Sequence, residues 1–403
     1  MPRTLHDVAI VGAYATPVTK KGGLPLRHLF AKAAIGTLKD AGLRPADVDG
    51  LITTPPGINP DIVIMFGAFL GKYLGFKSRI LEVVENGGTT SALALRTAAN
   101  EIATGRVKRC IVLAADERAR LGDMTDMNYT LRFGAYSNIG LQGAYDGAYG
   151  GGFPVPFYAM SGQRYMHEYG ATPEDFARVV VQLRSHAARH PGAEFRDPTT
   201  VEEVLKSPLQ SPPLTLHMCC PVSTAGAGVL LTTVEEAKKM GRPFVRIAGI
   251  GGYHEPEHFL PVSPERDFTT YRSAVEASKQ AYEEAGVGPK DIDVAEVYGV
   301  FAPSELMLYE DLGFVSKKGM AAQAVKDGKL TFGGDLVINP TGGRICFGHP
   351  AAATPLLETI EIVHQLRGSA SGRQVENARW GLTHAEHGCM NGSSVMVYEG
   401  VRA

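Results

Sequence analysis

The feature that most restricts the fold of this chain is a sequence pattern that occurs twice, with the two copies 244 residues apart (286 − 42 = 244). In each copy a helical pattern ends at a glycine, Gly42 or Gly286, and a proline follows three residues later, Pro45 or Pro289. Glycine directly after a helix, with proline just beyond it, is a helix-stop signal. The match continues through Asp47 with Asp291 and Asp49 with Asp293. A repeat of this length predicts two similar half-domains.

Strand-like and helical segments alternate in both copies. In the first copy the hydrophobic patterns predict strands at 7–13 and 109–115 and helices at 26–40 and 89–103. In the second copy the matching strands are 244–251 and 378–385, and the matching helices are 271–284 and 351–366. Such alternation is typical of α/β layers in which helices cover a mixed sheet. We therefore expect an α/β protein with an N-terminal half, residues 1–240, and a C-terminal half, residues 241–403, that stack through shared helices.

The segment from about residue 117 to residue 218 has no counterpart in the second copy. It contains a clear helix start, where Thr172 can cap the helix, Pro173 occupies the first turn and Asp175 completes a capping box. A strand at 222–233 then returns the chain to the first half. Because no Ser/Gly-rich or Pro-rich linker separates the parts, we expect one body with an inserted loop domain that shapes the substrate site.

The composition excludes several classes of protein. The 403 residues include 40 basic and 42 acidic side chains, a formal charge of −2 (40 − 42), so no basic surface for nucleic acid is predicted. No apolar stretch approaches the roughly 18 residues that a membrane-spanning helix needs, and no secretory signal is visible. The five cysteines have no CxxC spacing, so neither disulfides nor a zinc site is expected, and a cytoplasmic protein is predicted. His186 and His190 have helical spacing, but no third ligand for a metal accompanies them.

Three motifs connect the chain with a known family. Residues 15–17 read Ala-Thr-Pro, residues 339–343 read Asn-Pro-Thr-Gly-Gly, and residues 348–350 read Gly-His-Pro. With the duplicated halves and the insertion, these motifs resemble the thiolase superfamily, and residues 184–187 resemble the loop domain of its sterol-carrier-protein-type members. The resemblance covers nearly the whole chain. It implies the thiolase fold, in which two similar halves form duplicated αβαβα layers, and an acyl-CoA thioester as the substrate, with no covalently bound cofactor.

The position of the thiolase nucleophile holds no cysteine in this chain. Family members carry a reactive cysteine at the start of the helix after the third strand, where the helix N-terminus lowers the pKa of the thiol. Counting back along the predicted helix 89–103 places that position at Gly88. The adjacent Thr89 and Thr90 are hydroxyls without a visible base, so an acyl-enzyme is not expected.

A second departure from the family lies at residues 296–301, which read Glu-Val-Tyr-Gly-Val-Phe. Sterol-carrier-type thiolases have His-Asp-x-Phe here, and other thiolases have Asn-Glu-x-Phe. This chain has Tyr298 in place of the His or Asn, and Gly299 in place of the acid. Tyrosine here, with glycine at the nucleophile position, is similar to the thiolase-like retro-aldolases that cleave steroid side chains. Those aldolases have a second tyrosine where this chain has His349, so the resemblance implies a site that combines features of both subfamilies.

The remaining polar residues suggest roles in thioester-enolate chemistry. The resemblance implies His349 as an oxyanion donor, which in such sites contributes about 3–4 kcal/mol. Tyr298 could take the proton of a β-hydroxyl if a donor or cation lowers its pKa below the usual ~10, and Cys389 lies near the position of the thiolase acid–base cysteine. Each residue also has a structural interpretation, as a core tyrosine, a satisfied histidine or a small buried thiol. The substrate-binding residues that the resemblance implies are Asn339, Gly342, Gly343 and Phe301.

Other residues have more ordinary interpretations. Cys219 and Cys220 precede a buried strand and are expected in the core. His384 and His387 are expected to be packed or to line the site rather than to bind metal. For the phosphates of coenzyme A, we expect basic residues of the loop domain, such as Arg184 or Arg189.

Three functions agree with these motifs. The leading hypothesis is retro-aldol cleavage of a β-hydroxyacyl-CoA with a steroid-like or other bulky acyl chain, through a thioester enolate and without an acyl-enzyme. The alternatives are a thiolase-type acyltransferase, such as an acetyl-CoA acetyltransferase with Cys389 as its thiol, and a non-catalytic acyl-CoA-binding or lipid-binding protein. The resemblance also implies a homodimer formed through strands of the first half, and a small zinc-ribbon/OB-type partner subunit.

Overall fold

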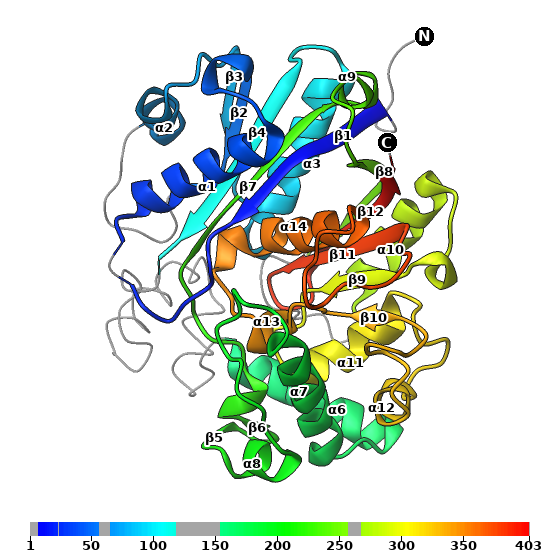
Figure 1. Cartoon of the computed structure of the whole chain (residues 1–403). Coiled ribbons are helices and arrows are strands. Elements are labelled where there is room, and N and C mark those ends of the chain that lie inside the picture. Colours follow the sequence, from blue (N-terminus) through cyan, green and yellow to red (C-terminus); the bar gives the residue numbers. More distant parts are fainter. Residues whose placement is uncertain (1–6, 23, 56–64, 118–153, 257–266, 403) are drawn as a thin grey trace.

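The computed structural model describes residues 7–22, 24–55, 65–117, 154–256 and 267–402. Their strands form one mixed sheet in the order β10-β9-β11-β12-β8-β1-β7-β4-β2-β3 (Figure 1). The strands of the first half are β1 (Val8–Ala15), β2 (Gly50–Thr53), β3 (Ile80–Val83), β4 (Arg109–Asp116) and β7 (Ala225–Thr233). Those of the second half are β8 (Phe244–His254), β9 (Val294–Val297), β10 (Val337–Ile338), β11 (Trp380–His387) and β12 (Gly392–Val401). The two halves have the same internal order, β1-β7-β4-β2-β3 and β8-β12-β11-β9-β10, so the α/β prediction and the duplication are confirmed.

The two halves join edge to edge as well as through helices. β1 and β8 are antiparallel neighbours, with Ala9 opposite Arg246 and Ile10 opposite Val245. The expectation that the halves meet through shared helices alone is therefore incomplete, because hydrogen bonds between these two first strands continue the sheet across the boundary.

Helices cover the faces of the sheet. The helices outside the insertion are α1 (Leu26–Ala41), α2 (Phe66–Leu74), α3 (Thr90–Ala103), α9 (Val234–Lys239), α10 (Arg272–Ala285), α11 (Ala302–Asp311), α12 (Ala321–Lys326), α13 (Gly343–Cys346) and α14 (Thr354–Leu366). α1 packs on β1, β7 and β4, and α10 packs on β8 and β12. α3 and α14 contact each other between the two halves (Figure 1). β7 is buried along its whole length because helices cover both of its faces.

The repeated helix stops have the predicted geometry. Gly42 and Gly286 both end their helices in the left-handed region, with φ of 65° and 71°. A short 3-10 turn follows each of them. Several predicted strand ends are wrong by two or three residues; β7 begins at Ala225 rather than 222, β8 continues to His254 rather than 251, and β11 begins at Trp380 rather than 378. The carboxylate of Asp293 accepts hydrogen bonds from the backbone N–H groups of Arg379 and Trp380, 2.8 Å each, and thereby holds residue 379 at the entrance of the strand.

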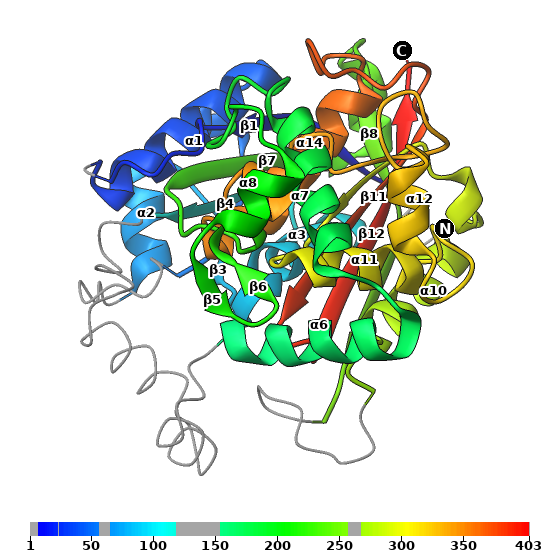
Figure 2. The ribbon, with the colours of Figure 1, turned by 90° about the horizontal axis from the view of Figure 1, so that it is seen from below.

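The insertion contains α6 (Val155–Tyr169), α7 (Pro173–Ala187), α8 (Val201–Lys206) and a hairpin of β5 (Leu209–Ser211) and β6 (Leu214–Thr215). The capping box is confirmed, because the carboxylate of Asp175 accepts a hydrogen bond from the backbone N–H of Thr172 at 2.9 Å. Although the insertion interrupts the first half, α7 packs on α11, α12 and α13 of the second half (Figure 2). The insertion therefore lies against the segments that carry the predicted site residues of the second half. The domain limits themselves stay a prediction.

Candidate active site

Gly88 lies directly against a tyrosine that the sequence separates from it by 210 residues. Gly88 belongs to a 3-10 turn, Gly87–Thr89, that leads into α3, and Tyr298 follows the last residue of β9. The phenol oxygen of Tyr298 is 2.9 Å from the position that a Cβ atom on Gly88 would take, and the backbone carbonyl of Glu386 is closer still. A side chain at position 88 therefore has no room, and the phenol occupies the neighbouring space.

His349 faces the same phenol. Its Nε2 lies 3.4 Å from the hydroxyl oxygen of Tyr298, and the two rings meet edge to face with centroids 5.3 Å apart. On the other side of the imidazole, Nδ1 lies 3.0 Å from the hydroxyl of Thr354 at the start of α14. The backbone N–H of His349 donates to the hydroxyl of Ser223, which donates in turn to Glu194 at 2.6 Å. The structure thus brings the two predicted residues Tyr298 and His349 together and holds the histidine from both sides.

Both side chains are neutral at neutral pH. Burial raises the pKa of Tyr298 well above its ordinary value, and the nearby carboxyl groups of Glu358 and Glu386 add to this. Burial, together with the charge of Arg344, lowers the pKa of His349 to about 3. The condition for Tyr298 to act as a base was a lowered pKa, and the structure contradicts it, because no donor or cation outweighs the loss of solvent. A buried neutral phenol is suited to donate a proton rather than to accept one.

An acid occupies the space that Gly299 leaves. A Cβ atom on Gly299 would overlap the carboxyl group of Glu305, which reaches this position from α11. The amide of Asn339 donates to both oxygens of Glu305, at 3.1 and 3.0 Å. The sequence motif did not indicate Glu305, because the acid of the family motif stands at the strand end, whereas Glu305 belongs to the following helix. The spacing of six residues between Gly299 and Glu305 carries no signal of that exchange.

The predicted substrate-binding residues of the second half have protein partners in the structure. The Oδ1 atom of Asn339 accepts a hydrogen bond from the backbone N–H of Val297 at 2.6 Å, so the amide fixes the end of β9 next to Tyr298. Gly342 lies against Ala187 of α7, and Gly343 lies against Asn339. Both glycines have positive φ, 104° and 60°. Their direct contact with a substrate stays a prediction.

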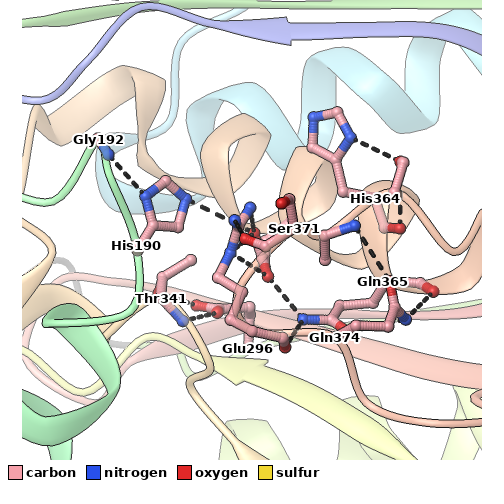
Figure 3. A network of polar contacts seen from close by, with 12 residues as sticks. His190, Gly192, Glu296, Thr341, His364, Gln365, Ser371 and Gln374 are labelled. Carbon is pink, nitrogen blue, oxygen red and sulfur yellow. Dashed lines mark hydrogen bonds and ion pairs between the residues drawn. The ribbon is translucent and has the colours of Figure 1, made fainter.

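A buried ion cluster lies behind Tyr298 and His349. Arg344 has no exposed side-chain surface and lies 3.4 Å from a carboxylate oxygen of Glu296 and 3.4 Å from one of Glu358. The hydroxyl of Thr341 donates to Glu296 at 2.9 Å (Figure 3). Burial raises the pKa of Glu296 to about 7, although Arg344 opposes this, and raises the pKa of Glu358 well above its ordinary value. The charge of Arg344 is the one that reaches His349.

The thiol next to Tyr298 is Cys220. Its backbone N–H donates to the carbonyl of Val300 at 2.9 Å, and its thiol is close enough to add to the raised pKa of Tyr298. Burial raises the pKa of Cys220 itself, which favours the thiol over the thiolate. The expectation that Cys220 lies in the core is therefore incomplete, because Cys220 also borders the site. The sequence could not indicate this, since a Cys-Cys pair before a buried strand carries no recognisable site motif. Cys389 is buried in the turn between β11 and β12, near Tyr158, and its acid–base role stays a prediction.

Aromatic residues form one wall of the site. The ring of Phe301 packs on the ring of Tyr158 from α6, with centroids 4.6 Å apart. The hydroxyl of Tyr158 donates to the carboxyl group of Glu386, whose backbone carbonyl contacts Gly88. Tyr158 and Glu386 were not predicted, because they come from the insertion and from a strand without a recognisable motif.

The two threonines after Gly88 have different surroundings. The hydroxyl of Thr90 donates to the carbonyl of Gly87 at 2.6 Å and accepts from the backbone N–H of Asn86 at 2.9 Å, so it closes the turn. The hydroxyl of Thr89 lies 3.0 Å from Nδ1 of His387. The hydroxyl of Thr90 is occupied by the backbone of its own turn, as expected. The expectation of a hydroxyl without a base is wrong for Thr89, because the tertiary structure brings the imidazole of His387 next to it.

A basic cluster borders the segment that leads to His349. Lys20 lies over the ring of Phe195 at 4.0 Å, and Arg184 lies over the same ring at 5.1 Å. The backbone N–H of Phe195 donates to the carbonyl of Cys346, three residues before His349. Arg189 is exposed and lies over Phe332 at 4.3 Å. The predicted Arg184 therefore lies near a second cation, Lys20, on the ring of Phe195. The predicted Arg189 lies on a different ring, that of Phe332, and is not part of this cluster.

The described residues offer neither a metal site of three or more ligands nor a membrane-spanning helix. Within the described residues, no group of three or more His, Cys, Asp and Glu side chains could hold a metal ion. The two helical histidines are used otherwise: His186 donates from Nδ1 to the carbonyl of Asn339, and His190 lies 3.7 Å from Glu361 (Figure 3). None of the helices in the described ranges has the length and apolar character to cross a membrane.

Comparison with known proteins adds to this geometry. A family model described as thiolase C-terminal domain-like matches residues 257–400. The chain is 30% identical over 397 residues to the acetyl-CoA acetyltransferase of Methanothermobacter thermautotrophicus, which covers 98% of this chain and 100% of that protein. It is 32% identical over 363 residues to the steroid side-chain-cleaving aldolase of Thermomonospora curvata, with 88% and 90% covered. The solved structure of the Ltp2-ChsH2(DUF35) aldolase matches with a TM-score of 0.83 at 28% identity over 97% of both chains.

Proposed function

The chain belongs to the thiolase superfamily, and on that premise we propose that it cleaves the Cα–Cβ bond of a β-hydroxyacyl-CoA by a retro-aldol reaction, without an acyl-enzyme. It is an enzyme of that superfamily that acts on acyl-CoA thioesters and needs no bound cofactor. The full-length similarity to enzymes removes the alternative of a non-catalytic binding protein. The observation that carries the proposal is the phenol of Tyr298 beside Gly88, where a thiolase nucleophile cannot fit.

The two neutral side chains have complementary roles in this reaction. When the Cα–Cβ bond breaks, the β-carbon becomes a carbonyl, the hydroxyl loses its proton, and the electron pair forms a thioester enolate. A hydroxyl of Thr354 that donates to Nδ1 of His349 leaves the single ring proton on Nε2, which can then donate to the enolate oxygen. Tyr298 delivers its proton to Cα, since a thioester enolate is a much stronger base than a phenolate. Its raised pKa keeps the phenol protonated at neutral pH, so that a proton is available for this transfer.

The basic cluster next to the site supports a position for coenzyme A. The cluster contains Lys20 and Arg184 around the ring of Phe195, on the chain segment that hydrogen-bonds to residues just before His349. We propose that these cations bind phosphate groups of coenzyme A, with the thioester directed toward His349. A change of either residue to alanine is expected to raise KM more than it lowers kcat, because both are distant from the reacting bond.

The acyl chain is proposed to be bulky and apolar. The two buried rings of Phe301 and Tyr158, which pack on each other beside the site, are apolar groups that an acyl chain of this kind would contact. The Thermomonospora relative cleaves steroid side chains by its name, and a steroid-like acyl group, with a role in lipid or steroid degradation, is the corresponding proposal for this chain. A cytoplasmic location also stays a prediction.

The test of the proposed function is the change Tyr298→Phe. Because it removes one hydroxyl and leaves the ring, the fold should persist while kcat for cleavage of a β-hydroxyacyl-CoA falls about 10²–10⁴-fold. The products are followed by mass spectrometry, and circular dichroism checks the fold. Tyr14→Phe, at an exposed position on β1, is the matched control and should cleave at the wild-type rate. Cleavage at an unchanged rate in Tyr298→Phe contradicts the proposal.

A second candidate function is acyl transfer, which the similarity to the archaeal acetyl-CoA acetyltransferase favours. It needs a thiol, and we propose Cys389 as the first candidate and Cys220 as the second. Incubation with acetyl-CoA followed by intact-mass and peptide mass spectrometry tests it. An acetyl group on either cysteine supports acyl transfer, and unmodified cysteines after full exposure to substrate exclude it.

We further propose a homodimer formed through β3. This strand is an edge of the sheet, and its exposed side chains include Leu81 and Val83. The neighbouring α2 adds the exposed rings of Phe69 and Tyr73, which stack with centroids 5.9 Å apart. An apolar edge strand beside an apolar helix face is suited to pair with a second copy of the chain. The name of the Ltp2-ChsH2(DUF35) aldolase includes a second component, and a small zinc-ribbon/OB-type partner is the corresponding proposal for this protein.

A further inference from the structure

A chain of hydrogen-bonding side chains extends from an exposed histidine to the turn that contains Gly88. His254, the last residue of β8, is exposed, and its Nδ1 lies 2.8 Å from Nε2 of His387 at the end of β11. On the opposite side of the His387 ring, Nδ1 lies 3.0 Å from the hydroxyl of Thr89. That hydroxyl can also donate to the carbonyl of Asn86 at 3.0 Å. Three side chains from three separate segments of the chain thus form a continuous path.

The path ends beside the reacting groups. Gly88 precedes Thr89, and Glu386 precedes His387. Gly88 contacts the carbonyl of Glu386, and Thr89 contacts the ring of His387, so the two contacts lie side by side. The same open side of Gly88 faces the hydroxyl of Tyr298. The turn that carries the inner end of the path therefore faces Tyr298 through Gly88, and the outer end reaches the exposed surface at His254.

The ring of His387 is held in the orientation that the path requires. A Cβ atom on Gly392 would overlap this ring, and one on Gly87 would lie 3.2 Å from its Cβ. The rings of His387 and His254 are stacked, with centroids 4.9 Å apart. The ring of His387 therefore fits closely against Gly392 and Gly87, and this packing restricts its orientation.

Each hydrogen bond on the path can run in either direction. In one arrangement Thr89 donates to Nδ1 of His387, and Nε2–H of His387 donates to Nδ1 of His254. In the other arrangement Nδ1–H of His254 donates to His387, and Nδ1–H of His387 donates to Thr89, whose hydroxyl turns to Asn86. A neutral imidazole has one N–H and one lone pair, which is what both arrangements need. Burial and the neighbouring His254 lower the pKa of His387 to about 4, so its ring is neutral at pH 7.

We infer that Thr89, His387 and His254 form a proton relay between the floor of the site and solvent, which removes the proton of the β-hydroxyl during cleavage. This inference rests on the proposed function, and it supplies the acceptor that Tyr298 cannot be. Thr89 takes the hydroxyl proton, directly or through one water, while its own proton passes to Nδ1 of His387. The Nε2 proton of His387 passes to Nδ1 of His254, and His254 releases its Nε2 proton to water. The reverse shift brings one proton in from water, restores the first arrangement and replaces the proton that Tyr298 gave to Cα.

The first test compares cleavage rates in relay variants. His387→Gln keeps a hydrogen-bonding side chain but cannot pass a proton through a ring, so kcat is expected to fall about 10²-fold with little change in KM. His254→Gln, at an exposed position, tests the outer half of the path even if His387→Gln fails to fold. His167→Gln, exposed on α6, is the matched control and should behave as wild type. Added imidazole should raise the cleavage rate of His387→Ala at least about tenfold, which a merely structural role of His387 would not produce. Unchanged kcat in both glutamine variants, or no effect of imidazole, overturns the relay.

A second measurement separates the relay from the proposed function. Exchange of the α-protons of an acyl-CoA in D2O, followed by mass spectrometry, requires proton transfer at Cα and contact with solvent, but no C–C cleavage. If the wild type exchanges protons but cleaves no β-hydroxyacyl-CoA, the proposed function is wrong. Loss of exchange in His387→Gln then still supports the relay, and full exchange in that variant contradicts it. A wild type without either reaction contradicts both proposals.

Discussion

The hydroxyl oxygen of Tyr298 lies 2.9 Å from the position that a Cβ atom on Gly88 would take. In the proposed active site, the two residues take the positions of the cysteine and the polar partner of the thiolase motifs. Glycine at 88 is needed because the carbonyl of Glu386 closes the remaining space. The loss of the nucleophile and the gain of the phenol are therefore one structural change rather than two.

The change Gly88→Cys tests this relationship. The new side chain would collide with the carbonyl of Glu386 and displace Tyr298, so we expect no acyl-enzyme and at least about a 10²-fold loss of cleavage, since small misplacements of reacting groups have effects of this size. Intact-mass spectrometry with acetyl-CoA and a cleavage assay measure the two outcomes. Gly288→Ala is the control, because its Cβ would meet nothing closer than 3.7 Å. An acetylated Cys at position 88 would show that the space exists.

The change Arg344→Met tests the ion cluster behind the site. Arg344 is the cation that pairs with Glu296 and Glu358 among the described residues. Its removal leaves a buried carboxylate without a positive partner, with an expected loss of about 3–5 kcal/mol in the free energy of unfolding. Loss of Arg344 also raises the pKa of Glu296 further, so its neutral form persists to higher pH in the folded state. The destabilisation is therefore greater at pH 8 than at pH 5, which denaturant titrations at the two values can measure. Arg379→Met, an exposed partner of Glu399, should cost less than about 1 kcal/mol at both. A pH-independent loss would contradict the expected ionisation of Glu296.

The buried His384 predicts a specific acid sensitivity. Burial lowers its pKa to about 3 in the folded state, against an ordinary value of 6.5. Between these values the unfolded chain binds a proton that the folded chain does not, so this residue makes stability fall as the pH falls from 6.5 toward 3. In His384→Asn that contribution is absent. The free energy of unfolding of the wild type should therefore fall by about 2 kcal/mol more than that of the variant when the pH is lowered from 7 to 5, as measured by urea unfolding. His167→Asn is the exposed control, and stability curves of His384→Asn and wild type that run parallel would contradict the prediction.

The change Val83→Lys tests the proposed dimer. Val83 is exposed on the edge strand β3, and a charge there would meet its own copy or apolar side chains across a symmetric interface. The dissociation constant of the dimer is expected to rise at least about tenfold, as light scattering over a dilution series can show. Ile35→Lys, an equally apolar exposed residue on α1, should leave the oligomeric state unchanged. Dimers of equal strength in both variants would place the interface elsewhere.

Much of the fold was predictable because its signals are local. The helix stops at Gly42 and Gly286 require φ > 0, which glycine adopts without strain, so the repeat could be read from residue types alone. The capping box of Thr172 and Asp175 is equally local. The motif at 348–350 likewise indicated His349, and the departure at 298 indicated Tyr298.

The remaining parts of the site depend on contacts between distant segments. Glu305 fills the space left by Gly299 because α11 turns back over the strand end, and Cys220 joins the site because its backbone pairs with Val300. The lowered pKa on which the role of Tyr298 as a base depended is contradicted, because the pKa depends on how completely the fold removes water from the phenol.

The sequence by itself determined the duplicated α/β architecture, and by resemblance it predicted Gly88 as the position of an absent nucleophile and Tyr298 and His349 as site residues. Only the tertiary structure decided that Tyr298 stands next to Gly88, that Tyr298 is a neutral phenol, and that His387 connects Thr89 with His254. The physical reason is the range of the forces involved. Backbone conformation and hydrophobic periodicity are set by residues a few positions apart. Side-chain contacts at this site, and the burial and ionisation that they produce, also join distant residues, such as Thr89 and His387, 298 positions apart, and Tyr298 and His349, 51 positions apart.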